Sequence, residues 1–223
     1  MTRIIAGAAG SLSLAVPRSG TRPTSDRVRE AIFSALEARD AIDGAVVLDL
    51  YAGSGALGLE SASRGAAEVV LVERAKPAGD VCRRNADAVA RAIGRGAARI
   101  RVVVKPVAGY LETAPAGVDL AFIDPPYDLD ETAVARDLAL LAPLLVPDAL
   151  VVVERSSRSP EPVWPAGVEL ERRRDYGETT LWWATAVDAT GSDAHAEAEV
   201  DASTDDDATT TAADQPVRPS QPE

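Results

Sequence analysis

Apolar runs of five or six residues alternate with longer amphipathic stretches through the middle of the chain. These runs predict five buried strands, at about 45–50, 69–73, 99–104, 118–123 and 149–154. Helical spacing of apolar positions predicts helices at about 56–64, 77–93, 107–112 and 132–141. Strands that alternate with helices specify a doubly wound, mainly parallel sheet with helices on both faces. Two last strands, 168–174 and 179–186, meet at a Tyr-Gly turn, so we expect an antiparallel pair and seven strands in all.

The first forty residues predict a small extension ahead of the sheet. Strand-like runs at 3–6 and 12–16 flank a glycine-containing turn and indicate a β-hairpin. Thr24, Ser25 and Asp26 then offer capping side chains for a helix whose apolar positions share one face. We therefore divide the chain into a hairpin and helix extension (1–40), an α/β domain (41–187) and a tail (188–223).

The tail carries most of the negative charge. The net charge of the chain is −12, and residues 188–223 contribute −9 of it, with ten acidic residues against Arg218. Almost no large apolar side chain lies in this segment, so it is expected to be disordered. Residues 1–39 carry six arginines against three acidic residues, and a positive arm on a nearly neutral body permits nucleic-acid binding.

Two scarce residue types exclude several kinds of chemistry. Cys82 is the single cysteine, which rules out an internal disulfide and fits a reducing, cytoplasmic compartment. We expect Cys82 to be a buried apolar residue. The single histidine, His195, lies in the tail, so we expect neither histidine catalysis nor a metal site. No signal-peptide core and no apolar run of about 18 residues is found, so no membrane association is expected.

A glycine-rich turn follows the first buried strand. Gly53, Gly55 and Gly58 satisfy the G-x-G-x-x-G spacing, and Glu73 ends the next strand 20 residues after Gly53. Glycines allow a tight turn and close approach of the backbone to a ligand, while a carboxylate at the position of Glu73 accepts hydrogen bonds from ribose hydroxyls. This pattern alone does not separate NAD from S-adenosylmethionine.

A stiff acidic segment, Asp124-Pro125-Pro126-Tyr127, follows the strand at 118–123. Both prolines fix φ and lack an N–H, and ligands bind at the carboxyl ends of strands in such sheets. An enzyme that methylates the planar amine of a base would use this segment to position its substrate. The Asp124 carboxylate and the Pro125 carbonyl would accept hydrogen bonds from the two N–H groups of the amine, and Tyr127 would stack on the flat base.

Two features favour S-adenosylmethionine over NAD. Asp49 lies four residues before Gly53. A carboxylate at this position can bind the methionine amino group or a neighbouring water, whereas it would repel a pyrophosphate. The Asp-Pro-Pro-Tyr segment has no evident use in hydride transfer. We therefore predict a site for two ligands, a methyl donor and a flat amine.

At these residues the chain resembles the bacterial small-subunit rRNA guanine-N2 methyltransferases, the RsmD family. The matching stretches are Arg3–Gly7, Thr21–Glu30, Leu48–Glu60 and Asp124–Tyr127. The resemblance implies a Rossmann-like S-adenosylmethionine-dependent methyltransferase fold, with the methyltransferase domain at 41–187. It implies methylation of the exocyclic amine of one guanine in 16S rRNA that is partly assembled with ribosomal protein in the small (30S) subunit. We expect the enzyme to act as a monomer.

The site residues implied by this reading fall into two groups. The cofactor is expected to contact Asp49, Ala52, Gly53, Ser54, Gly55 and Glu73, with Thr24 and Arg27 closing over the cofactor or the RNA. The base is expected to contact Asp124, Pro125, Pro126 and Tyr127.

The chain departs from the family pattern at a few positions. Family members usually carry Lys and Arg in the hairpin, where this chain has Ala-Ala-Gly-Ser-Leu-Ser at 8–13. Pro106 stands where the family often has a small acidic or amide residue near adenine. Asn85 matches a frequent family Asn, with a role on the helix surface as the alternative.

Three other functions are compatible with the residues alone. The same acceptor segment serves DNA amino-methyltransferases, although this chain lacks a separate target-recognition domain. An NAD-dependent oxidoreductase and a nucleotide-binding module without catalysis are the alternatives from other classes.

Overall fold

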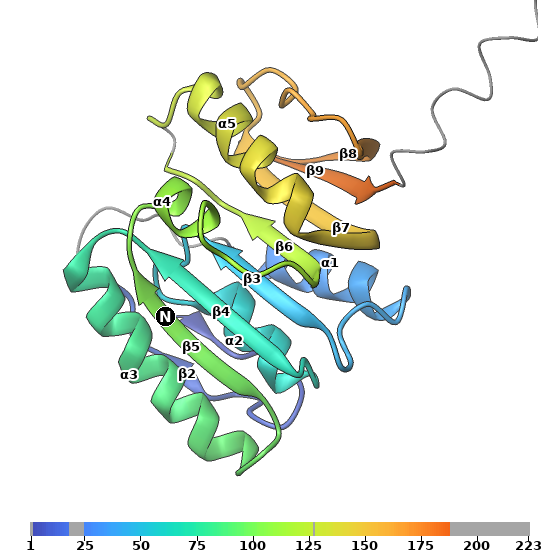
Figure 1. Cartoon of the computed structure of the whole chain (residues 1–223). Coiled ribbons are helices and arrows are strands. Elements are labelled where there is room, and N and C mark those ends of the chain that lie inside the picture. Colours follow the sequence, from blue (N-terminus) through green and yellow to red (C-terminus); the bar gives the residue numbers. More distant parts are fainter. Residues whose placement is uncertain (1, 18–24, 127, 188–223) are drawn as a thin grey trace, which may run out of the picture. The chain divides into compact units, whose positions relative to one another are not determined.

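A seven-stranded sheet organises the chain in the computed structural model, which describes residues 2–17, 25–126 and 128–187 (Figure 1). The strand order is β5-β4-β3-β6-β7-β9-β8. The strands are β3 (Val46–Leu50), β4 (Glu68–Glu73), β5 (Arg99–Val104), β6 (Val118–Ile123), β7 (Leu145–Ser156), β8 (Val168–Tyr176) and β9 (Thr179–Ala186). The first five run parallel, whereas β9 pairs antiparallel with both β7 and β8. The predicted mainly parallel, seven-stranded sheet is confirmed.

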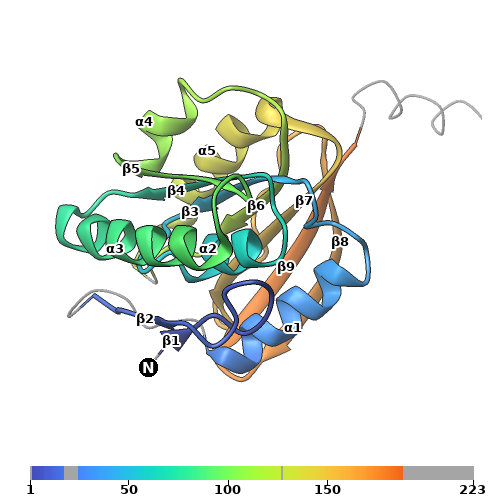
Figure 2. The same ribbon diagram turned by 90° about the horizontal axis from the view of Figure 1, so that it is seen from below.

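Helices cover both faces of this sheet, as Figure 2 shows. They are α1 (Asp26–Glu37), α2 (Ala56–Ser63), α3 (Lys76–Ile93), α4 (Val107–Leu111) and α5 (Glu131–Leu141), with a short 3-10 helix η1 (Ala142–Leu144). Buried residues of α1, α2 and α3 form one core with alternate strand residues such as Val47 and Phe122. Buried residues of α4 and α5 form the other core with the intervening residues, such as Leu48 and Ile123. This alternation follows from the two-residue repeat of a strand.

The N-terminal hairpin is present but short. Strand β1 (Thr2–Arg3) pairs antiparallel with β2 (Ser13–Leu14). The hairpin is attached to α2, since the buried Glu60 carboxylate accepts hydrogen bonds from the backbone N–H groups of Ile5 at 2.6 Å and Ala6 at 3.0 Å. The predicted cap of α1 is confirmed at Ser25, whose side chain accepts a hydrogen bond from the Val28 N–H at 3.3 Å.

The strand order reverses between β3 and β6. From β3 the chain moves outward through β4 to β5, and then returns to β6 on the other side of β3. Crevices for ligands form where such a reversal occurs, at the carboxyl ends of the strands. The ends of β3, β4 and β6 carry the glycine loop, Glu73 and Asp124, so the fold brings the two predicted motifs to one edge.

Several element boundaries differ from the prediction. Strand β7 begins at Leu145 rather than at about 149, because Leu145 already pairs with Val118 before an irregularity in the ladder. Cys82 is fully buried, as expected, and burial raises the pKa of its thiol. Residues 2–187 belong to one compact unit; the tail lies outside the described residues, so the three-part division stays a prediction. Within the described chain, no helix is both long and apolar enough to cross a membrane.

Candidate active site

The glycine loop between β3 and α2 follows a path that only a few residue types tolerate. Gly53 and Gly55 have φ of 55° and 80°, in the left-handed region that favours glycine. Gly55 caps the N-terminus of α2 without a side-chain hydrogen bond. A side chain at Gly55 would also lie 3.0 Å from the Cys82 sulfur. The loop therefore presents backbone at its surface, which suits close approach of a ligand.

Glu73 fixes this loop from the end of the neighbouring strand. One oxygen of its buried carboxylate accepts a hydrogen bond from the Gly53 N–H at 3.0 Å, and the other accepts one from the Ala75 N–H at 2.7 Å. The structure thus brings together the two residues that the sequence pairs at a spacing of 20. A carboxylate oxygen has two lone pairs, so each oxygen retains acceptor capacity for a hydroxyl.

Asp49 joins β3 to α2 beneath the loop. Its buried carboxylate accepts a hydrogen bond from the Gly58 N–H at 2.8 Å. Burial raises the pKa of Asp49 to about 7; the bond from Gly58 opposes this shift, and the negative charges of Asp124 and Glu73 add to it. Three predicted site carboxyls therefore lie within electrostatic reach of one another. The described contact of Asp49 is internal, and its contact with a cofactor stays a prediction.

The Asp124-Pro125-Pro126 segment continues β6 beyond its last paired residue. The Asp124 N–H donates to the Leu50 carbonyl of β3 at 3.5 Å, and the Leu129 N–H donates to the Pro126 carbonyl at 3.0 Å. Pro125 is buried, whereas Asp124 and Pro126 are half-buried. Tyr127 and Thr24 lie outside the described residues.

Buried Arg155 of β7 supports the turn after the acceptor segment. Its guanidinium donates to the Leu129 carbonyl at 2.9 Å and to the Glu131 carboxylate at 2.6 Å. The side chain is only 2% exposed, so this ion pair is largely shielded from water. The sequence carries one signal that could have indicated this role, namely a cation directly after a run of buried strand residues.

Glu154 lies beside Asp124 at the same edge of the sheet. Ile123 and Val153 are partners in the β6–β7 ladder, so the next residues along the two parallel strands are Asp124 and Glu154. Glu154 is buried. Sequence reasoning missed it, because the hydrophobic pattern does not say which strands are neighbours.

Asn85 connects three segments around the glycine loop. Its amide exchanges hydrogen bonds of 2.9 Å with the Ala15 N–H and carbonyl, and it also donates to the Ser54 carbonyl at 2.9 Å. The residue is buried, so the alternative of a helix-surface role is wrong.

The remaining predicted residues have simpler positions. Ala52 is buried and its N–H donates to the Val72 carbonyl at 2.9 Å, which ties the loop to β4. Arg27 is exposed in the first turn of α1, and its role stays a prediction. Pro106 precedes α4, and its carbonyl accepts the Tyr110 N–H at 3.1 Å.

Comparison with known proteins points to one family. The family described as "Conserved hypothetical protein 95" matches residues 2–185. Ribosomal RNA small subunit methyltransferase D of Escherichia coli is 35% identical over 79% of this chain and 85% of its own. The putative rRNA methyltransferase YlbH of Bacillus subtilis is 31% identical over 79% and 95%. A solved structure, the putative methyltransferase yhhF from E. coli, is 31% identical over 83% and 98%, with a TM-score of 0.72.

Proposed function

We infer the function of this chain from the family to which it belongs. That family is the Conserved hypothetical protein 95 family, which is also the family of ribosomal RNA small subunit methyltransferase D. The chain is an rRNA methyltransferase with a Rossmann-like fold. Its acceptor is the exocyclic N2 amine of a guanine in 16S rRNA, in a partly assembled small subunit, and its donor is S-adenosylmethionine. The observation that carries the proposal is the meeting of the glycine loop, Glu73 and Asp124 at one edge of the sheet.

The residues present fit this donor. Glu73 keeps acceptor capacity for ribose hydroxyls, and the backbone at Gly53, Ser54 and Gly55 offers a surface without bulky side chains. Asp49 adds a carboxyl whose negative form is favoured by a nearby positive charge. When bound, S-adenosylmethionine supplies an electrophilic methyl group on a sulfonium centre, and it carries the positive charge that these carboxyls favour.

Asp124 and the two prolines prepare the amine. The lone pair of an exocyclic amine is delocalised into the purine ring, so the free amine is a weak nucleophile. Acceptors at the Asp124 carboxylate and the Pro125 carbonyl hold its two N–H bonds and direct the lone pair toward the methyl group. Transfer would exchange the sulfur–carbon bond of the donor for a new nitrogen–carbon bond, and the nitrogen would lose one proton, which the Asp124 carboxylate would receive.

Glu154 selects guanine. The Watson–Crick edge of guanine presents two adjacent donors, N1–H and N2–H. The residues that follow the Ile123–Val153 pair of β6 and β7 are both acidic, and we assign Asp124 to N2 and Glu154 to N1. Adenine offers an acceptor at N1, which a carboxylate would repel. This match favours guanine in RNA over the amino-methylation of adenine in DNA.

Labelled-methyl transfer tests the proposal. Undermethylated 30S subunits, naked 16S rRNA and duplex DNA are compared side by side with the same enzyme and donor, and the expected acceptor is rRNA in one or both ribosomal forms. Transfer to DNA alone would support the alternative amino-methyltransferase. Thermal shift separates the other classes, since S-adenosylhomocysteine at 100-fold excess over Kd adds about 2.7 kcal/mol of stability, whereas stabilisation by NADH alone would contradict the proposal.

A further inference from the structure

The segment from Arg74 to Lys105 is strongly basic in a chain whose net charge is −12. It carries nine Lys and Arg residues against two acidic ones, for a net charge of +7. All nine are exposed: Arg74, Lys76, Arg83, Arg84, Arg91, Arg95, Arg99, Arg101 and Lys105. We call these nine residues the α3 surface. By contrast, the N-terminal hairpin at residues 2–14 carries one cation, Arg3.

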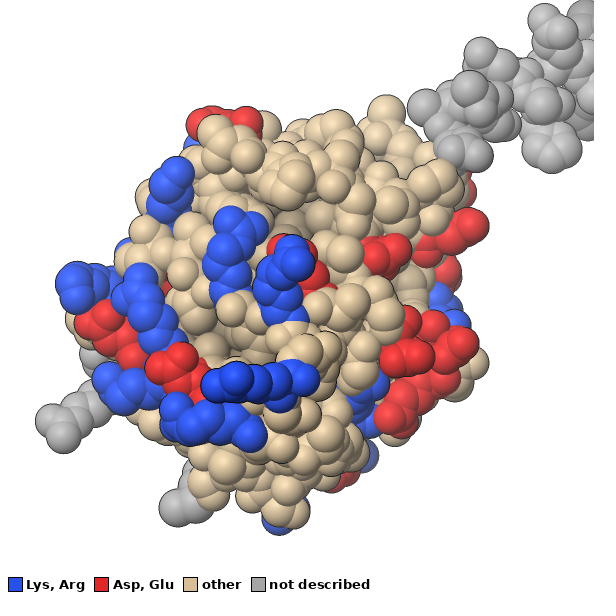
Figure 3. Space-filling model, turned by 60° about the horizontal axis from the view of Figure 1, so that its bottom comes forward, with Lys and Arg blue, Asp and Glu red and all other residues tan. Residues whose placement is uncertain are grey.

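The α3 surface lies around the edge of the sheet formed by β5, with the cations of α3 on one face and Arg101, which donates to Tyr110 of α4, on the other. Helix α3 buries Val81, Cys82 and Val89 against the sheet, which leaves its cations on the outer side. Figure 3 shows Lys and Arg gathered on the side where Figure 1 places α3 and β5, with a few acidic side chains among them. Eighteen residues of helix extend about 27 Å, so the surface spans several successive phosphates of a nucleic-acid strand.

One end of this surface adjoins the candidate active site. Arg74 directly follows Glu73, and the Lys105 N–H donates to the Glu73 carbonyl at 3.2 Å. The charge of Arg74 also lowers the pKa of Tyr51 in the glycine loop, against the larger upward effect of burial, so the guanidinium lies within electrostatic reach of the loop. A polyanion on the α3 surface would therefore pass beside the edge at which the methyl group is transferred.

Only part of this charge is neutralised within the protein. Lys76 and Arg83 both pair with Asp80, at 3.0 and 2.8 Å, and Arg99 pairs with Glu68 at 3.2 Å. The other six cations make no ion pair with any residue that the structure describes: Arg74, Arg84, Arg91, Arg95, Arg101 and Lys105. Cations that are not held in ion pairs can neutralise phosphates, which releases the counterions condensed on the nucleic acid.

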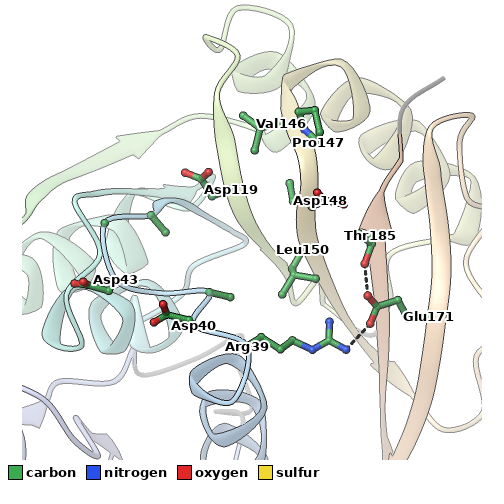
Figure 4. A pocket seen from close by; sticks show the side chains of 14 residues that line it. Arg39, Asp40, Asp43, Asp119, Val146, Pro147, Asp148, Leu150, Glu171 and Thr185 are labelled. Atoms are coloured by element: carbon green, nitrogen blue, oxygen red, sulfur yellow. Dashed lines mark hydrogen bonds and ion pairs between the residues drawn. The ribbon is translucent and has the colours of Figure 1, made fainter. Parts of the chain in front are cut away.

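Acidic residues gather around a separate cavity, beyond the β5 edge that carries the α3 surface. A cavity of about 520 Å³ lies at the amino ends of the strands, and its lining includes Asp40, Asp43, Asp119, Asp148 and Glu171, with Arg39 as the one cation among the described lining residues (Figure 4). That arginine is already paired with Glu171 at 2.6 Å. This acidic cavity repels a nucleic acid, whereas the α3 surface attracts it.

We propose that the α3 surface binds the phosphate backbone of the rRNA next to the methylated guanine. The inference rests on the proposed function for the identity of the RNA, whereas its physical basis is the charge and exposure of these residues. The contacts are to phosphates, so they add affinity and fix the orientation of the RNA without reading its sequence.

RNA affinity measured against salt tests this proposal. The variant is Arg84→Ala/Arg91→Ala, and the matched control is Arg158→Ala/Arg174→Ala, which removes two exposed arginines from the β7–β8 loop and β8. At about 0.1 M salt the first variant is expected to bind 16S rRNA at least about tenfold more weakly, with a slope of log K against log salt reduced by about one to two. The control is expected to keep the affinity and slope of the unmodified protein.

Three outcomes would overturn the proposal. One is an unchanged affinity and slope in the Arg84/Arg91 variant, and another is an equal loss in the control. The third is normal binding of naked 16S rRNA with weakened binding of 30S subunits, which would assign the surface to ribosomal protein. An unchanged stabilisation by S-adenosylhomocysteine shows that each variant is folded. Binding is measured without methyl transfer, so failure of the proposed reaction is distinguishable from failure of this inference.

Discussion

Tyr51 of the glycine loop donates its phenolic hydrogen to the buried carboxylate of Asp137 on α5. Tyr51 has a φ of 66°, which is uncommon for a residue with a side chain and ends the extended backbone of β3. Burial and the Asp137 carboxylate raise the pKa of Tyr51, so the hydroxyl stays protonated as a donor. Because α5 follows the acceptor segment, this one bond connects the two halves of the candidate site.

Removing that hydroxyl is expected to destabilise the protein. Tyr51→Phe leaves the 1% exposed carboxylate of Asp137 without its donor, which costs about 1–3 kcal/mol in the free energy of unfolding. Urea denaturation measures this loss. Tyr110→Phe is the matched control, because the Tyr110 hydroxyl accepts only a 3.3 Å bond from the exposed Arg101, and it is expected to cost less than about 0.5 kcal/mol. Equal losses of unfolding free energy in the two variants would show that the Tyr51–Asp137 bond stabilises the fold no more than the Arg101–Tyr110 bond does.

Replacement of Gly58 by alanine is expected to destabilise the fold. A Cβ at this position would lie 2.3 Å from a Leu71 methyl carbon and 2.9 Å from one of Val69, so Gly58→Ala forces α2 away from the sheet. The free energy of unfolding is expected to fall by about 1–3 kcal/mol. Gly109→Ala in α4 is the control, since its Cβ meets nothing within 4 Å and alanine is the better helix former. A Gly58→Ala protein as stable as the Gly109→Ala protein would contradict the packing described for α2.

The buried Asp49 is expected to make stability depend on pH. Its pKa is raised from 3.8 to about 7 in the folded chain, so the folded state holds a proton that the unfolded state releases in this interval. The stability from this group is therefore fully present below about pH 4 and is lost as the pH rises to about 7.

Asp49→Asn removes this dependence, because asparagine keeps an acceptor for the Gly58 N–H but does not ionise. Unfolding of both proteins in urea at pH 5, 6, 7 and 8 should show the variant gaining stability relative to the unmodified chain, by more than about 1 kcal/mol over the range. A difference between the two proteins that stays constant with pH would count against the raised pKa.

Glu154→Gln is expected to change the choice of base. With the methylated guanosine replaced by 2-aminopurine, the N2 amine is kept but N1 becomes an acceptor, which the Glu154 carboxylate repels and a glutamine amide satisfies. The variant should narrow the ratio of kcat/KM for guanine over 2-aminopurine by at least about tenfold, in line with the 1–3 kcal/mol that such contacts discriminate. Glu73→Gln is the control, because it should raise the KM for the cofactor with both substrates and leave the ratio unchanged. An unaltered ratio in the Glu154 variant would remove Glu154 from recognition of the base.

The local sequence pattern predicted the strands and the loop that form most of this site. The runs ending at Leu50, Glu73 and Ile123 are strands, and the spacing of 20 between Gly53 and Glu73 corresponds to a 3.0 Å hydrogen bond. These relationships were predictable because parallel strands align their carboxyl ends, so motifs that follow different strands meet at one edge.

The supporting contacts were not predictable in the same way. Tyr51 and Asp137 are 86 positions apart, and the bond between Arg155 and Leu129 depends on β7 lying next to β6. Hydrophobic periodicity identifies a strand but not its neighbours, so such pairs appear only once the strand order is known. The basic segment at 74–105, by contrast, was predictable from the sequence. Counting the charges of each segment, and not only those of the two ends of the chain, gives +7 for it.

Nucleoside analysis of methylated rRNA identifies the base that the protein modifies and the residue on which the reaction depends. Undermethylated 30S subunits are incubated with S-adenosylmethionine and either the unmodified protein or Asp124→Ala, and the digested 16S rRNA is examined by mass spectrometry. The proposed function predicts N2-methylguanosine with the unmodified protein and none with the variant, while S-adenosylhomocysteine still stabilises both. Methylation of adenine or cytosine, or an Asp124→Ala protein that forms N2-methylguanosine at the unmodified rate, would contradict it.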